Sequence, residues 1–71
     1  MADIVVDPLY WDDAYPIALA LRDLYPLTDP GSIEQEVLHG WVVSLRDFVD
    51  DPAVRRSDWL EQIQAEWLEL T

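Results

Sequence analysis

The chain is short and strongly acidic. Its 71 residues include 15 Asp or Glu and four Arg but no Lys, which gives a formal net charge of -11 at pH 7. A chain of this length forms one small domain at most, and the absence of Cys excludes a disulfide framework and a thiolate metal centre. The charge disfavours nucleic-acid binding, which depends on Lys and Arg, and favours basic surfaces or cations as partners. The competing interpretation is that the acidity only keeps a small protein soluble.

The first ten residues carry a short apolar run, Ile4–Val6, between two aspartates. This run is too short to build a sheet, so we expect residues 1–10 to form an N-terminal arm that docks on the first helix through Leu9 and Tyr10. The segment lacks the basic region and long apolar region of a signal peptide, and no stretch of the chain approaches the roughly 20 apolar residues of a membrane span. We therefore expect a cytoplasmic protein that does not contact a membrane.

A first helix is predicted from Asp13 to Tyr25. Asp12 and Asp13 are expected to cap its N-terminus, because a short carboxylate accepts hydrogen bonds from the free N–H groups of a first turn. The Tyr25-Pro26 pair ends the helix, since the residue before a proline is pushed out of helical geometry. One face carries the apolar residues Ile17, Leu21, Leu24 and Tyr25.

A second helix follows a turn-rich linker, and its apolar residues are Ile33, Val37, Leu38, Trp41, Val42 and Leu45. Its start has two interpretations. Ser32 and Gln35 form an S-x-x-Q capping box, or the chain is first extended and the helix begins near Glu36. Gly40 lies inside this helix, where a glycine costs about 1 kcal/mol relative to alanine unless a close contact requires it.

The second helix is predicted to end near Leu45 or Phe48, directly before an acidic turn. Asp47, Asp50 and Asp51 fall in this turn, ahead of a proline. Carboxylates at a helix C-terminus are disfavoured by the helix dipole, so local stability does not explain them. A cation or a basic partner would relieve the repulsion between them. The alternative is a solvated turn without a binding role.

A third helix is predicted to be capped by Ser57, and its apolar residues are Leu60, Ile63, Trp67 and Leu70. Three tryptophans, Trp11, Trp41 and Trp67, lie on apolar faces and are expected in the core. Trp59 lies beside the main apolar face, and it is the aromatic residue expected to reach an interface.

No catalytic set of residues is recognisable. His39 is the only histidine, and without a Cys, a second His or a nucleophile–base pair it is expected to be structural. We therefore do not expect an enzyme. Arg22 and Arg46 lie among acids and are expected to form surface ion pairs. Arg55 and Arg56 are expected either to pair with the acidic turn or to leave one rim of the surface positive.

An ordered set of residues runs through the chain from Trp11 to about Leu68. It consists of Trp11, Asp13, Ile17, Leu21, Tyr25-Pro26, Asp29-Pro30, Trp41, Leu45, Asp47-Phe48, Asp50-Asp51-Pro52, Leu60-Glu61, Ile63 and Trp67. None of its short motifs is specific alone, but the whole set at this spacing resembles the IscX family of small acidic accessory proteins of bacterial iron–sulfur-cluster assembly. The chain departs from that family in having no Lys, in reading Gly31-Ser32 where a basic turn is usual, and in its longer N-terminal arm.

The resemblance implies a mainly α, compact three-helix domain of modified winged-helix type over residues 11–71. It implies binding to a cysteine desulfurase through an acidic face, at a basic patch that frataxin also uses, together with weak surface binding of Fe(II). The protein would act as a monomeric adaptor or regulator of sulfur delivery, or as an iron donor. The alternative is an acidic protein-interaction module or nucleic-acid mimic that inhibits a basic partner.

Seven residues are candidates for the partner-binding face, and they are Asp13, Asp23, Asp29, Asp47, Asp50, Asp51 and Trp59. Four of the same carboxylates, those of Asp13, Asp47, Asp50 and Asp51, are candidates for the iron. Fe(II) accepts carboxylate oxygens as ligands, and water completes its coordination shell.

Overall fold

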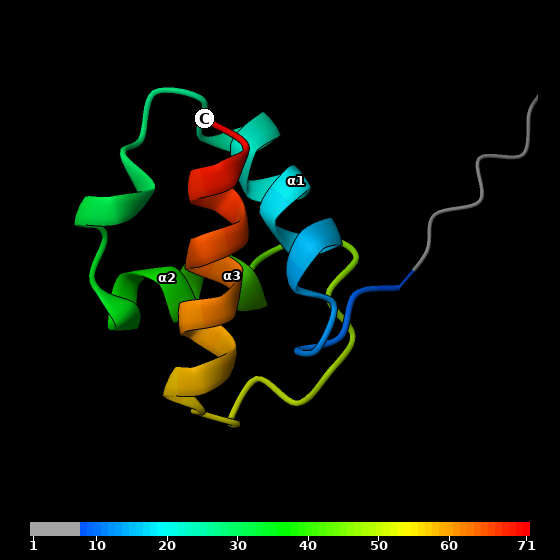
Figure 1. Cartoon of the computed structure of the whole chain (residues 1–71). Coiled ribbons are helices and arrows are strands. Elements are labelled where there is room, and N and C mark those ends of the chain that lie inside the picture. Colours follow the sequence, from blue (N-terminus) through cyan, green and yellow to red (C-terminus); the bar gives the residue numbers. More distant parts are fainter. Residues whose placement is uncertain (1–7) are drawn as a thin grey trace, which may run out of the picture.

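Three α-helices form the framework of the protein in the computed structural model, which describes residues 8–71 (Figure 1). The elements in chain order are α1 (Ala14–Leu24), the short 3-10 helix η1 (Pro30–Ser32), α2 (Gln35–Val43) and α3 (Ser57–Glu69). Helices α1 and α3 lie side by side and share the most extensive contact in the fold, while α2 runs across the opposite flank of α3 (Figure 1). The predicted run at Ile4–Val6 lies outside the described residues.

Helix α1 ends as predicted but begins differently. The N–H of Tyr25 still bonds to the carbonyl of Leu21 at 2.8 Å, and the proline that follows stops the helix. Asp13 occupies the N-cap position, yet its carboxylate makes no bond to the first turn. Instead it accepts the N–H of Tyr10 at 3.0 Å. The prediction of a carboxylate cap was therefore wrong, because this side chain closes the turn before the helix.

Helix α2 ends earlier than predicted, and its start agrees with one of the two interpretations. Ile33 is extended and Glu34 takes the N-cap position without a side-chain bond, so the capping box was wrong and the interpretation with a short extended piece was right. At the other end the helix stops at Val43. The hydroxyl of Ser44 donates to the carbonyl of Gly40 at 2.7 Å, which satisfies one of the free carbonyl groups of the last turn.

The helix does not extend to Phe48, because this residue pairs with the N-terminal segment. Phe48 forms an isolated parallel β-bridge with Leu9, and this pairing requires an extended backbone. The acidic turn is consequently a loop that begins four residues after the last residue of α2, Val43. The interpretation of its carboxylates as destabilised by a helix dipole was wrong, since that effect is confined to the last turn.

Helix α3 begins at Ser57, with Arg56 and not Ser57 at the N-cap position, and no side chain caps it. The predicted serine cap was therefore wrong. The apolar face of this helix was predicted correctly, because Leu60, Ile63 and Trp67 are all buried.

A single core gathers apolar residues from all three helices, the N-terminal segment and the loop after α2. Its buried members are Leu9, Trp11, Ile17, Ala18, Leu21, Leu38, Val42, Leu45, Leu60, Ile63 and Trp67. Trp41 is only partly buried and stacks on Tyr25, with ring centroids 3.9 Å apart. Leu24, predicted on the buried face of α1, is 60% exposed. Because Leu9 is buried, the folded unit includes a residue that the sequence assigned to an arm.

The predicted mainly helical, three-helix class is confirmed. Residues 8–71 contain no β-strand, and their one β-bridge joins Leu9 to Phe48. The winged-helix type stays a prediction. None of the helices in this part of the chain is both long enough and apolar enough to cross a membrane.

Candidate acidic interaction site

The acidic loop is fastened to the N-terminal segment by backbone hydrogen bonds. The N–H of Leu9 donates to the carbonyl of Asp47 at 2.8 Å, and the N–H of Val49 donates to the carbonyl of Leu9 at 3.0 Å. These two bonds form the parallel bridge between Leu9 and Phe48. Two segments almost 40 residues apart in the sequence are thereby joined, and the loop does not project freely into solvent.

Trp11 completes this attachment. Its backbone N–H donates to Oδ2 of Asp50 at 3.0 Å, and its indole Nε1–H donates to the carbonyl of Asp51 at 2.8 Å. Trp11 is itself 2% exposed, so both donors need a partner within the protein. We call the contacts of Leu9 and Trp11 with residues 47–51 the N-terminal clasp.

The carboxylates of Asp50 and Asp51 are occupied by backbone donors. Asp50 accepts the N–H of Trp11 through Oδ2 and that of Asp51 through Oδ1, the second at 2.7 Å. Asp51 accepts the N–H of Ala53 at 2.9 Å. A carboxylate that satisfies backbone N–H groups stabilises the loop, which explains why acids stand here without any appeal to a partner.

The other candidate carboxylates fall into two groups. Asp13 and Asp29 serve their own turns: Asp13 bonds to Tyr10, and Asp29 accepts the N–H of Gly31 at 3.0 Å and the hydroxyl of Ser32 at 2.8 Å. Within residues 8–71 the carboxylates of Asp23 and Asp47 accept no backbone N–H, and each pairs with the arginine next to it in the sequence.

The structure brings some of the candidates together and separates others. The clasp places the turn that ends at Asp13 beside the loop that carries Asp50 and Asp51. Asp29 is the N-cap residue of η1 and bonds within its own turn. Within residues 8–71 no group of three or more His, Asp or Glu side chains is placed to hold a metal ion. The four carboxylates predicted as iron ligands therefore form no preorganised three-ligand centre, and iron binding stays a prediction.

All four arginines form ion pairs with acids. Arg22 pairs with Asp23 and Arg46 pairs with Asp47, at 3.4 Å and 3.3 Å, as predicted. The remaining two arginines do not pair with the acidic loop, which corrects one of the two interpretations of their role. Arg55 lies 3.7 Å from Glu36, and Arg56 lies 2.6 Å from Asp58. Thirteen acids stand in residues 8–71; four pair with arginines, so nine make no ion pair with another described residue.

The pair of Arg56 and Asp58 is the tightest of the four. The guanidinium donates from Nε and Nη2 to both oxygens of the carboxylate, at 3.1 Å and 2.6 Å. This bidentate bond lowers the pKa of Asp58 and raises that of Arg56. The same guanidinium lies 4.2 Å from the centre of the Trp59 ring. Trp59 is half-buried and stacks toward Trp11, so the aromatic residue expected to reach an interface is partly covered by the protein itself.

His39 has the structural role that the sequence predicted. It is 6% exposed, stacks on Trp11 with ring centroids 5.2 Å apart, and places Nε2 at 3.0 Å from the carbonyl of Val54. A carbonyl only accepts, so Nε2 carries the hydrogen in this bond. His39 thus links α2 to the segment before α3.

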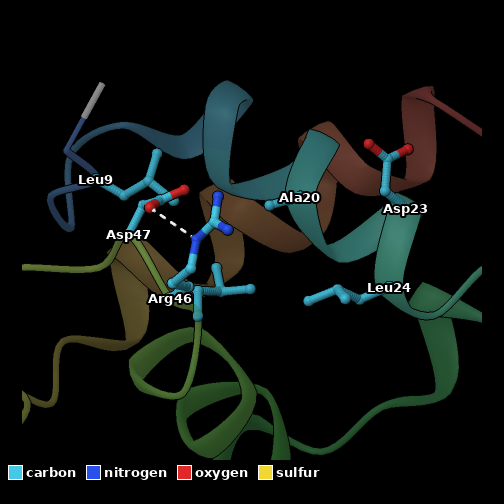
Figure 2. Close-up of a pocket in the computed structure, with 7 residues that line it drawn as sticks. Leu9, Ala20, Asp23, Leu24, Arg46 and Asp47 are labelled. Carbon is cyan, nitrogen blue, oxygen red and sulfur yellow. Dashed lines mark hydrogen bonds and ion pairs between the residues drawn. The ribbon is translucent and has the colours of Figure 1, made fainter. Parts of the chain in front are cut away.

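An open groove of about 470 Å³, which no sequence pattern predicted, lies between the end of α1 and the loop after α2 (Figure 2). Its lining is formed by Leu9, Ala20, Asp23, Leu24, Leu45, Arg46 and Asp47. Leu24 points into the space toward Arg46, whereas the carboxylate of Asp23 turns outward (Figure 2). The groove therefore combines apolar side chains with the ion pair of Arg46 and Asp47, and Asp23 lies at its edge (Figure 2). The sequence placed Leu24 on the apolar face of the first helix and did not show that this leucine is exposed.

Comparisons with known proteins identify the family of this chain. A family model described as iron-sulphur cluster assembly matches residues 9–71. A protein of Pseudomonas aeruginosa that is named only as uncharacterized is 41% identical over 61 residues, which cover 86% of this chain and 92% of that protein. The match covers the clasp, the three helices and the acidic loop, and it confirms the resemblance. The chain belongs to the iron–sulphur cluster assembly family that includes IscX.

Proposed function

We propose that this protein is a noncatalytic accessory factor of iron–sulphur cluster assembly that binds a cysteine desulfurase through an acidic face. In this role it acts as a monomeric adaptor or regulator of sulfur delivery in the cytoplasm. Family membership supports the process, and the resemblance to IscX supports the partner. The resemblance implies that frataxin binds the same basic patch of the desulfurase. This protein and frataxin are therefore expected to compete for that patch.

The observation that carries the proposal is the excess of carboxylates over cations. Every arginine is already paired, and nine acids in residues 8–71 are left without a basic partner in this part of the chain. Such a surface attracts a basic protein and accelerates the encounter with it. It repels nucleic-acid phosphates for the same reason.

Two of the candidate acids fit a partner contact better than the rest. Asp23 and Asp47 flank one groove and hold no backbone N–H, so they can exchange their arginines for basic groups of a partner without loss of the fold. Asp50 and Asp51 are less suitable, since their carboxylates already accept backbone hydrogen bonds. We therefore assign the first electrostatic contact to the pair Asp23 and Asp47.

Iron binding is a secondary part of the proposal. Fe(II) accepts oxygen ligands and keeps bound water where few carboxylates are available. With no three-ligand group in residues 8–71, the ion is expected to bind weakly, through one or two carboxylates of the loop at Asp47, Asp50 and Asp51. Whether the ion is donated or sensed does not affect the partner contact.

The partner contact is tested by calorimetric titration of the purified protein with cysteine desulfurase over a series of NaCl concentrations. The double variant Asp23→Asn with Asp47→Asn is expected to bind more weakly at low salt and to show a shallower dependence of affinity on salt, because two interfacial charges are gone. The matched control is Glu61→Gln with Glu69→Gln, which removes two exposed charges from α3.

The two variants separate a specific contact from general acidity. Equal losses in both would show that only net charge matters, and that Asp23 and Asp47 are not the contact. If wild-type protein did not bind the desulfurase at low salt, the proposed function would be wrong. Added frataxin should displace the bound protein, and binding of both at once would contradict the shared patch.

The iron contact is tested separately by an anaerobic NMR titration with Fe(II). We expect line broadening at the amides of residues 47–51 at millimolar ion, and less broadening at α3. Uniform broadening over the acidic surface, or none, would contradict a site at this loop.

A further inference from the structure

We propose that the groove between α1 and the loop after α2 takes an apolar side chain from a basic segment of the partner. This inference rests on the proposed function, since it concerns how the partner is recognised. The groove is lined by the apolar residues Leu9, Ala20, Leu24 and Leu45, by Asp23 and Asp47, and by Arg46, which pairs with Asp47 (Figure 2).

The first argument is the exposed apolar surface within the groove. Leu24 is 60% exposed although it belongs to the last turn of α1. Its side chain points across the hollow toward Arg46 and not into the core (Figure 2). Leu45 and Leu9, which also line the groove, are 6% and 8% exposed. An apolar side chain that entered here would therefore meet leucine on more than one side, and it would remove the exposed part of Leu24 from water.

The second argument is charge complementarity, which identifies the occupant. Among the residues that the structure describes, the two carboxylates beside the groove pair only with arginines, at 3.4 Å and 3.3 Å. The side chain of Arg46 is 84% exposed, and an exposed pair of this kind contributes little to stability. Lys or Arg residues next to the entering apolar side chain can therefore displace these arginines from the carboxylates at small cost.

The occupant is consequently a basic segment with an apolar side chain among its Lys and Arg residues. Residues 1–7 of this chain fit less well, because they bring Asp3 and Asp7 and no basic side chain to an acidic rim. A second copy of the chain fits less well for the same reason, as its net charge is also -11. The experiment described next distinguishes these two occupants from the partner.

The test compares two leucines that lie three residues apart. Leu24→Ser removes the apolar wall of the groove, whereas Leu27→Ser alters a leucine that is 99% exposed and does not line it. Binding to purified cysteine desulfurase is measured by calorimetry as a function of NaCl. We expect Leu24→Ser to weaken binding about tenfold, with the salt dependence unchanged, and Leu27→Ser to bind within about twofold of wild type.

A second variant approaches the groove from the other side. Ala20→Leu fills the hollow without any change of charge, and it should also weaken binding with an unchanged salt dependence. A structural role alone would lower the thermal stability of the free variants and leave the affinity of the folded fraction unaltered. The methyl signals of Leu24 and Ala20 in the wild-type protein should shift when the desulfurase is added.

Each outcome decides between the possibilities. Wild-type binding with equal affinities for Leu24→Ser and Leu27→Ser would overturn the groove while leaving the proposed function intact. No wild-type binding would overturn both. Contacts between the methyl groups of residues 4–6 and Leu24 in the free full-length chain would assign the groove to the chain itself, and concentration-dependent shifts of Leu24 would assign it to a second copy. Either result would overturn the inference.

Discussion

Replacement of Asp50 should destabilise the fold more than replacement of any other acid in the loop. Asp50→Ala removes the acceptor of the Trp11 N–H and of the Asp51 N–H. The second donor is exposed and can bond to water, but the first is partly buried. A buried donor left without its charged partner costs about 2 kcal/mol. Asp50→Asn retains one carbonyl oxygen, which can still accept the Trp11 N–H while the exposed Asp51 N–H bonds to water, so it should lose less stability than Asp50→Ala.

The assay is urea unfolding followed by tryptophan fluorescence, together with calorimetric melting. For a domain of this size about 2 kcal/mol corresponds to a decrease of roughly 8–16 °C in Tm. The control is Asp47→Ala, whose carboxylate pairs only with the exposed Arg46 and whose loss should cost under about 0.5 kcal/mol. If Asp50→Ala lost no more stability than Asp47→Ala, the structural role of Asp50 would be refuted. If Asp50 has this structural role, weaker partner binding by its variants results from a destabilised fold and not from the loss of a direct contact.

Three further substitutions test other parts of the fold. Gly40→Ala should raise the free energy of unfolding by about 1 kcal/mol in urea titrations, because a Cβ there meets no atom within 4 Å besides its chain neighbours and the backbone of its own helix. A lower free energy of unfolding would contradict this. Trp11→Phe should cost about 2–3 kcal/mol in the same assay, since the Asp51 carbonyl loses its indole donor and the core loses volume; a loss below about 1 kcal/mol would contradict this. Arg56→Gln should return the lowered pKa of Asp58 toward its ordinary value of 3.8, measured by carboxyl NMR. With Arg56 present, the pair stabilises the fold above that value and loses this effect as the pH falls through the lower, folded-state pKa; an unchanged Asp58 titration would contradict the bond.

The helices and most of the core followed from local sequence. Apolar residues at helical spacing identified Ile17, Leu21, Ile63 and Trp67 correctly, and the proline after Tyr25 fixed the end of α1. These features depend on neighbours within a few turns. The predictions of the ends of α2 and of the helix caps were wrong because these features depend on side chains that have closer competing partners. Asp13 bonds to the turn before its helix, for example.

The site was harder to predict because its geometry comes from long-range contacts. The acidic loop was identified by composition, but the sequence does not show that Asp50 holds a backbone N–H from a residue 39 positions away. Nor does it show that Leu24 is exposed while Leu21, three residues earlier, is 0% exposed. Both facts depend on how the loop after α2 meets α1. The sequence therefore located the acids and left their division between structure and binding undetermined.

The N-terminal clasp also has a consequence for the order in which the protein assembles. Its bonds close a loop of 39 residues that contains both α1 and α2. Closing so long a loop has a large entropic cost unless the helices between its ends have already condensed. The clasp should thus form late, after α1 and α2 have packed. Because Leu9 belongs both to the clasp and to the groove, the groove exists only after this last step, and a partner that fills it would lock the final stage of folding.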